Sequence, residues 1–142
     1  MARLILDTGV LIGSVRGLVD LVSLRDADDL AIPAVVVAEY LAGTLADQNP
    51  GRAAAQTAFL DDVLAVMPIV EYDREVAEHH ADLLAHTRRA GTRRGPHDLI
   101  IAATARATGR ELLTADARAE FGTLPGVEVR VVESTPRSRT KK

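Results

Sequence analysis

The stretch RLILDTGVLIGSVRG, residues 3–17, decides the fold of this 142-residue chain. The apolar run Leu4-Ile5-Leu6 ends abruptly at Asp7, and a second apolar run follows at once. The first run predicts a buried strand, and residues 8–15 predict a short helix that Gly17 terminates. A buried carboxylate needs a partner or a cation. We therefore expect Asp7 to face a cleft at the end of the strand.

The rest of the chain alternates between strand and helix patterns. Strands are predicted at residues 30–32, 67–70, 111–114 and, with clean alternation, 127–132, and helices at 18–28, 34–48, 52–66, 73–90, 97–108 and 115–121. Continuous apolar strands joined by helices are typical of a parallel sheet that is covered on both faces. The predicted fold class is therefore α/β, a three-layer α/β/α domain around a central, mainly parallel sheet of about five strands.

Composition sets the class of protein. Hydrophobic residues make up 47% of the chain and the mean hydropathy is +0.07, which is typical of a globular domain. We predict a single domain over residues 1–133 and a basic, flexible tail over 134–142. The chain has no cysteine, which excludes disulfides and thiolate metal sites. No apolar stretch approaches the ~18 residues of a membrane span and no signal-peptide pattern is present, so we expect a cytoplasmic protein.

The basic residues are unevenly distributed. The formal net charge is −3, yet arginines gather in HTRRAGTRRG (Arg88, Arg89, Arg93 and Arg94), and both lysines lie in the tail. Arginine suits bidentate contacts to phosphate. These four arginines are either a substrate-binding group or solvated charges at a helix end.

Acidic residues stand at positions that the pattern otherwise marks as buried. Glu39 lies among apolar helical neighbours, Asp98 begins a nearly all-apolar helix, and Asp116 follows the strand ending at Thr114. Taken singly, Asp98 and Asp116 read as helix N-caps and Glu39 as the partner of an arginine. The Thr114 hydroxyl could bind a carboxylate or a metal-bound water. His97 is a further candidate cap or substrate contact, whereas the three histidines of the preceding helix read as surface or packing residues.

Taken together, the acids predict a metal site. Ligands of parallel sheets bind beyond the carboxyl ends of the strands, where Asp7, Asp98 and Asp116 are expected. Carboxylates converging on one cleft repel and raise each other's pKa, and a hard divalent cation removes that conflict. All-oxygen ligands suit Mg²⁺ or Mn²⁺. Such a metal lowers the pKa of a bound water and stabilises a leaving oxygen, which is phosphate chemistry.

Four segments carry a resemblance to a known family. LILDTGVLI, VVVAEYLAG, PHDLIIAATARATG and LLTADARAEF resemble, in order and spacing, the four acidic motifs of PIN-domain ribonucleases, over residues 3–132. The size and layout resemble the VapC toxins of VapBC toxin–antitoxin modules. The resemblance implies the toxin of a type II module, an endoribonuclease dependent on Mg²⁺ (or Mn²⁺) that cleaves RNA by metal-activated water.

The resemblance also implies residue roles and partners. Asp7 and Asp98 correspond to direct metal ligands, Asp116 to a third or water-mediated ligand, and Glu39 to a residue that holds a metal-bound water or a second ion. Gly9 departs from the family's frequent serine. The implied partners are an RNA substrate and a VapB-type antitoxin whose C-terminal part blocks the cleft, and the implied state is a homodimer.

Other functions fit the sequence less well. A haloacid-dehalogenase-like phosphatase needs a second aspartate where Gly9 stands, and a response-regulator receiver needs a lysine inside the domain. A non-catalytic PIN domain that serves as an RNA- or protein-binding module is the remaining alternative. Aromatic content of 3% is too low for a base-stacking platform, so RNA shape and arginine contacts are the expected sources of selectivity.

Overall fold

The computed structural model of the chain describes residues 1–116 and 121–132. The described strands are β1 (Arg3–Leu6), β2 (Asp29–Pro33), β3 (Ile69–Val70), β4 (Glu111–Thr114) and β5 (Val129–Val131). The described α-helices are α1 (Thr8–Val15), α2 (Leu21–Ala27), α3 (Ala34–Ala46), α4 (Pro50–Leu64), α5 (Arg74–Ala90) and α6 (Pro96–Thr108), and a 3₁₀ turn, η2, spans Phe121–Thr123.

The five strands form one parallel sheet in the order β3-β2-β1-β4-β5, which confirms the predicted fold class. The apolar residues of β1, β2 and β4 are buried, as continuous apolar runs predicted. β5 is an edge strand, which agrees with its alternating pattern. The expectation for residues 67–70 was wrong in part: the strand has only two residues, and Ile69 is 38% exposed because β3 is the other edge.

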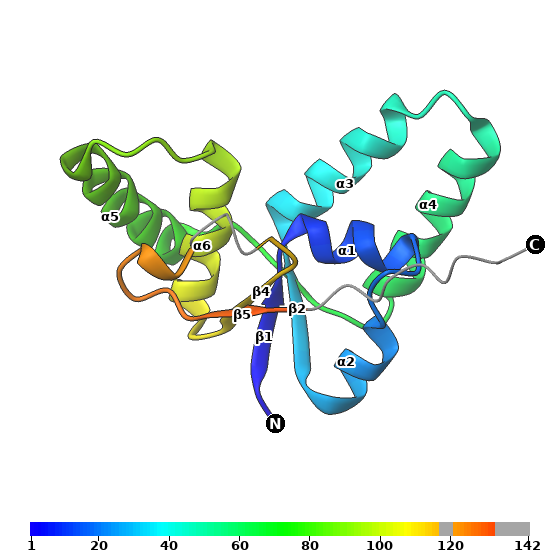
Figure 1. Ribbon diagram of the computed structural model, residues 1–142, viewed down its shortest axis with the longest axis horizontal. Coiled ribbons are helices and arrows are strands. Elements are labelled where there is room, and N and C mark those ends of the chain that lie inside the picture. The colour runs from blue at the N-terminus through cyan, green and yellow to red at the C-terminus, as the bar shows by residue number, and fades with distance from the viewer. Residues whose placement is uncertain (117–120, 133–142) are drawn as a thin grey trace, which may run out of the picture.

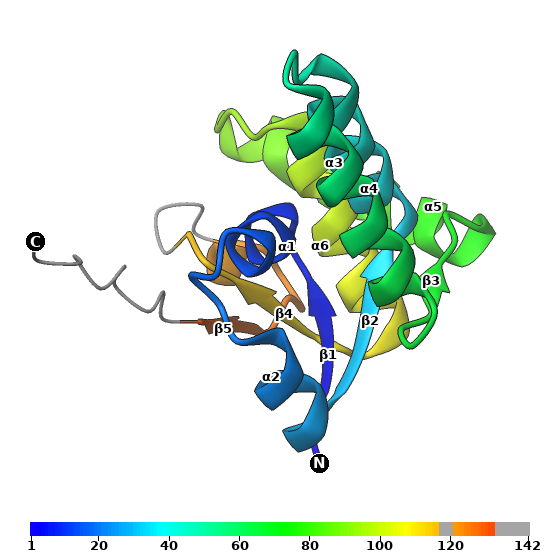
Figure 2. The same cartoon turned by 90° about the vertical axis from the view of Figure 1, so that its right-hand side faces the viewer.

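Helices cover both faces of the sheet (Figures 1 and 2). α1 and α2 lie on one face, and α5 and α6 pack together on the other. α3 and α4 form an antiparallel pair that projects beyond the carboxyl ends of the strands (Figure 1). Within the described ranges, no helix is both long enough and apolar enough to cross a bilayer. This arrangement leaves the carboxyl edge of the sheet between α3 and the start of α6.

The helix ends follow the local signals in the sequence. Asp73 caps α5 by accepting a hydrogen bond from the Val76 backbone N–H (2.9 Å), and α5 and α6 end at glycines with positive φ, Gly91 and Gly109. The helix expected at 52–66 instead begins at Pro50, because Asn49 caps it and proline suits the first helical position. Most of the helix expected at 115–121 lies outside the described residues, as does the tail at 134–142.

Candidate active site

Asp7 stands where β1 ends and α1 begins. Its backbone N–H donates to the Leu113 carbonyl (2.9 Å), so β4 fixes its position from the side. One carboxylate oxygen, Oδ1, accepts from the Thr8 backbone N–H (2.8 Å), and Oδ2 accepts from the Thr114 hydroxyl (2.9 Å). The expected hydrogen bond from Thr114 to a carboxylate is confirmed. A carboxylate between two buried segments is therefore both the N-cap of α1 and a polar group at the strand end.

Glu39 reaches the same place from α3. The Thr8 hydroxyl donates to Glu39 Oε1 (2.9 Å), and His97 Nδ1 lies 3.5 Å from Oε2. The side chain is 29% exposed, so it is partly withdrawn from water. The alternative reading of Glu39 as an arginine partner is wrong for the described part of the chain, where its ion-pair contact is His97.

Asp98 is the third residue of α6 and not its cap. The N-cap is Gly95, which makes no side-chain hydrogen bond, so the simple cap interpretation of Asp98 is wrong. A Cβ on Gly95 would lie 3.1 Å from Asp98 Oδ2. That separation is tighter than an ordinary contact, so glycine at this position leaves room for the carboxylate.

Asp116 lies two residues beyond the end of β4. Its backbone N–H donates to the Thr114 hydroxyl (3.1 Å), and its charge acts on Asp98. Thr114 thus links Asp116 to Asp7, since the same hydroxyl donates to the Asp7 carboxylate. The residues that would follow a cap at Asp116 lie outside the described ranges, so the cap interpretation of Asp116 stays a prediction.

The four acids act on one another electrostatically. Burial raises the pKa of Asp7, and the charges of Asp98 and Glu39 raise it further, against hydrogen bonds from Thr114 and Thr8 that lower it. Burial also raises the pKa of Asp98, reinforced by Glu39 and Asp116 and opposed by Arg94 and His97. The predicted convergence of carboxylates is therefore present in the structure.

The four candidate RNA-binding arginines are not equivalent. Arg94 lies close enough to lower the pKa of Asp98, and its guanidinium donates to the Thr123 hydroxyl. Arg93 is exposed in the segment before α6, and Arg88 and Arg89 are exposed in the last turn of α5. The structure brings Arg94 to the acids and places the other three along the approach to α6.

A sequence profile of the PIN domain matches residues 4–123. The chain belongs to the PIN domain family. Ribonuclease VapC1 of Rickettsia felis is 29% identical over 131 residues, which are 92% of this chain and 97% of the relative. The tRNA(fMet)-specific endonuclease VapC of Salmonella typhimurium is 25% identical over 132 residues, 91% and 97% of the two chains.

Solved structures agree with this PIN domain assignment. VapBC2 from Rickettsia felis, bound to a DNA fragment from its promoter, matches with a TM-score of 0.81 and 21% identity over 92% of this chain and 98% of the other. VapBC-5 from Mycobacterium tuberculosis matches with a TM-score of 0.74 and 29% identity over 93% of this chain and 100% of the other. The predicted resemblance to VapC-type PIN domains is confirmed.

Two features of this PIN domain's site could not be predicted from its sequence. Thr8 and Glu39 are 31 positions apart, so their hydrogen bond depends on how α3 is placed against α1. Among the described residues, a Cβ on Gly9 would meet only the Ala115 side chain, at 4.0 Å. Gly9 itself has no hydroxyl to offer where the family often has serine. The preceding residue, Thr8, donates its hydroxyl to Glu39.

A groove of about 900 Å³ adjoins the acids of the PIN domain. α1, α3 and α4 form it, with apolar side chains such as Ile12, Val15 and Tyr40, and polar ones such as Arg16 and Gln48. Glu39 also lines the groove, so the groove reaches the acidic cluster.

The ligand atoms of the site are of the type that a hard divalent cation prefers. All four acids offer oxygen ligands, and no thiolate exists in the chain. As the side chains stand, however, no three acids or histidines among the described residues are gathered closely enough to hold one ion. Burial and then the charges of neighbouring acids raise the pKa of Asp7 and Asp98, and a cation bound between them would stabilise their ionised forms.

Proposed function

We propose that this chain is the toxin of a VapBC-type module, an endoribonuclease that hydrolyses RNA phosphodiester bonds with the help of Mg²⁺, for which Mn²⁺ can substitute. One observation carries the proposal: carboxylates from β1, α3, α6 and the end of β4 converge on one site, where burial and then the charges of neighbouring acids raise the pKa of Asp7 and Asp98. The ribonuclease and endonuclease names of its VapC relatives support the same chemistry.

Asp7 and Asp98 would hold the metal ion, with Asp116 as a direct or water-mediated third ligand. Bound there, Mg²⁺ supplies a water of lowered pKa and neutralises charge that develops on the phosphate. Thr114 orients Asp7 Oδ2 by hydrogen bonding, and the Thr8 backbone N–H orients Oδ1. These contacts hold the carboxylate before any substrate arrives.

Glu39 is set up differently, with its two oxygens in separate roles. Thr8 holds Oε1 at 2.9 Å, which leaves Oε2 directed toward His97 at the opening of the site. Oε2 is thus the oxygen available to orient the attacking water. Arg94, beside Asp98, is placed to bind a phosphate oxygen of the RNA backbone.

The test is cleavage of total RNA by the purified protein. We expect cleavage with Mg²⁺ or Mn²⁺, none with EDTA, and new ends that map to a small set of sites. Attack by water leaves no 2′,3′-cyclic phosphate, which separates this activity from a contaminating nuclease that uses the ribose hydroxyl. RNA binding without metal-dependent cleavage would instead favour the non-catalytic binding module.

The groove between α1, α3 and α4 supports an antitoxin partner. Similar chains have been solved as VapBC complexes, and the groove is large enough for a peptide segment and has Glu39 in its lining. We expect a VapB-type antitoxin to bind there with its C-terminal part and to slow RNA cleavage. An antitoxin complex that cleaves RNA as fast as the free protein would refute inhibition. The homodimer is tested separately, by light scattering of the free protein at micromolar concentration.

A further inference from the structure

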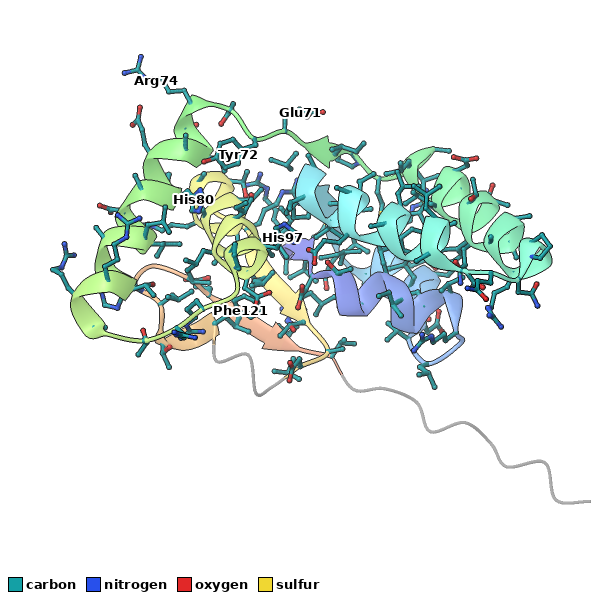
Figure 3. The ribbon with its side chains drawn as sticks, turned by 90° about the horizontal axis from the view of Figure 1, so that it is seen from above. Glu71, Tyr72, Arg74, His80, His97 and Phe121 are labelled. Carbon is teal, nitrogen blue, oxygen red and sulfur yellow. The ribbon has the colours of Figure 1, made fainter. Side chains whose placement is uncertain are left out.

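His97 lies at the site but has no part in the roles assigned above. It is the second residue of α6, after Pro96, and its position is therefore fixed by the start of that helix. Its Nδ1 is 3.5 Å from Glu39 Oε2. Figure 3 shows the labelled side chain on the side of α6 that faces α1 and α3. Of the chain's four histidines, this is the one that contacts an acid of the site.

The second ring nitrogen of His97 is available to a ligand. The side chain is 59% exposed although Nδ1 faces Glu39. Nε2, on the other side of the ring, makes no hydrogen bond within residues 1–116 and 121–132. His80, by contrast, is occupied by the Tyr72 hydroxyl, 2.8 Å from its Nδ1. His97 therefore presents a free polar atom at the rim of the acidic cluster.

The charged residues around His97 indicate which kind of ligand its Nε2 would contact. His97 and Arg94 are the two basic residues whose charges lower the pKa of Asp98. Arg94 is also engaged by Thr123. A polyanionic strand that approaches four carboxylates needs favourable contacts close to the reacting bond. The exposed imidazole edge is the group next to Glu39 that can supply one.

We propose that His97 Nε2 contacts the sugar–phosphate backbone of single-stranded RNA beside the scissile bond. Nε2 either accepts a hydrogen from a ribose 2′-hydroxyl or donates one to a phosphate oxygen. The inference rests on the proposed function, since the contact matters only if RNA enters this site. Meanwhile Nδ1 keeps the ring against Glu39, so the contact is made by a positioned side chain.

The experiment measures binding of fluorescein-labelled single-stranded RNA and of DNA of the same sequence, by anisotropy over a range of salt. The parent is the full chain carrying Asp7→Asn, a change that we expect to abolish cleavage. Three variants at His97 divide the roles of its nitrogens: alanine removes both, glutamine places an amide near the position of Nε2, and asparagine places one near that of Nδ1. His86→Ala, on α5, is the matched control, and a thermal midpoint checks each variant's fold.

We expect His97→Ala to weaken RNA binding by roughly 3- to 10-fold and His97→Gln to recover most of that loss. His97→Asn should bind RNA as weakly as His97→Ala, and His86→Ala should bind it as tightly as the parent. A loss confined to RNA identifies the 2′-hydroxyl, and an equal loss for DNA with a shallower salt slope identifies the phosphate. Unchanged binding by His97→Ala, or better rescue by asparagine than by glutamine, would overturn the proposal while leaving the proposed function intact. Failure of the parent to bind any RNA would overturn both.

Discussion

The two ends of the parallel sheet use the same kinds of charged residue for different purposes. At the amino ends of the strands, Arg130 bonds Asp28 (3.2 Å) and Glu111 (2.8 Å). Nearby, Arg110 donates to the carbonyls of Leu4 (3.0 Å) and Asp29 (3.1 Å). Each of these carboxylates therefore has an arginine, and the network joins β1, β2, β4 and β5.

At the carboxyl ends the acids face one another. Glu39 raises the pKa of both Asp7 and Asp98, and threonine hydroxyls, not arginines, hold Asp7 and Glu39. An acid cluster of this kind costs stability in the absence of a cation. The difference indicates that the amino end serves the fold and the carboxyl end serves the chemistry.

The largest expected effect is on activity at the carboxyl end. Asp7→Asn or Asp98→Asn removes a proposed metal ligand without changing size, and we expect RNA cleavage to fall roughly 100-fold or more. Glu111→Gln, the matched change at the amino end, should leave cleavage per folded molecule unchanged. Rates on total RNA with Mg²⁺ measure both. Normal cleavage by Asp98→Asn would reduce that residue to a structural part of α6.

The largest expected effect on stability is at the amino end. The Arg110 side chain is 9% exposed, and its loss removes the guanidinium that donates to the carbonyls of Leu4 and Asp29. We expect Arg110→Ala to lower the free energy of unfolding by about 2–4 kcal/mol. Arg130→Ala is the control, because that side chain is 42% exposed and its loss should cost about 1 kcal/mol or less. Urea denaturation compares the two, and equal costs would contradict the structural role of burial here.

A smaller effect concerns stability at the acidic cluster. An acid whose pKa is raised in the folded state holds its proton more tightly there than in the unfolded chain. The free energy of unfolding therefore falls as pH rises from the ordinary value of 3.8 through the raised pKa of Asp98. Without metal at neutral pH, Asp98→Asn should consequently melt a few degrees higher than the parent.

Added Mg²⁺ should reverse that order, because a ligand that binds only the folded state stabilises it and the variant has lost a carboxylate ligand. Thermal melts with EDTA and with Mg²⁺, repeated near pH 4, measure the crossover. The gain in EDTA should shrink as the pH is lowered toward 4, because the raised pKa of Asp98 favours its protonated form in the folded state. A variant less stable than the parent under every condition would show that Asp98 is not strained by its neighbours.

Sequence reasoning reached the fold and the four acids by local rules. Asp7 interrupts two apolar runs, and Asp98 opens an apolar helix, so their oddity is visible within a few residues. Gly91 and Gly109 mark helix ends where the backbone is in the left-handed conformation that favours glycine, and those ends were predicted correctly. Local chemistry specifies such features, and they need no knowledge of tertiary contacts.

The features that sequence reasoning missed depend on packing between distant segments. Asp98 looks like a cap, yet helix α6 begins two residues earlier, at Pro96, since proline suits the first turn and Gly95 leaves space for the carboxylate. The Thr8–Glu39 hydrogen bond and the approach of His97 to Glu39 join α1, α3 and α6. The strand at β3 is short because its pairing with β2 is limited to two residues, which the apolar run at 67–70 does not reveal.

The smallest expected effect distinguishes two neighbouring arginines on the approach to the acids. Arg93 is exposed and makes no hydrogen bond or ion pair in the described part of the chain, whereas Arg94 is held by Thr123 beside Asp98. In an Asp7→Asn background with Mg²⁺, we expect Arg93→Gln to weaken RNA binding about 2-fold and to flatten the log–log salt dependence by roughly one unit or less. Arg94→Gln should cost somewhat more, because an arginine already held in place loses less entropy on binding a phosphate.

The control for both arginines is Arg74→Gln, which removes an exposed arginine from the far end of α5, where it pairs with Glu78. Because phosphate contacts position RNA without reading its bases, base preference should be the same in all three variants. An unchanged affinity and salt slope for Arg93→Gln and Arg94→Gln would return these residues to solvated charges at a helix end. In that case the favourable contacts that bring RNA to the acids would have to come from a bound metal ion and from His97.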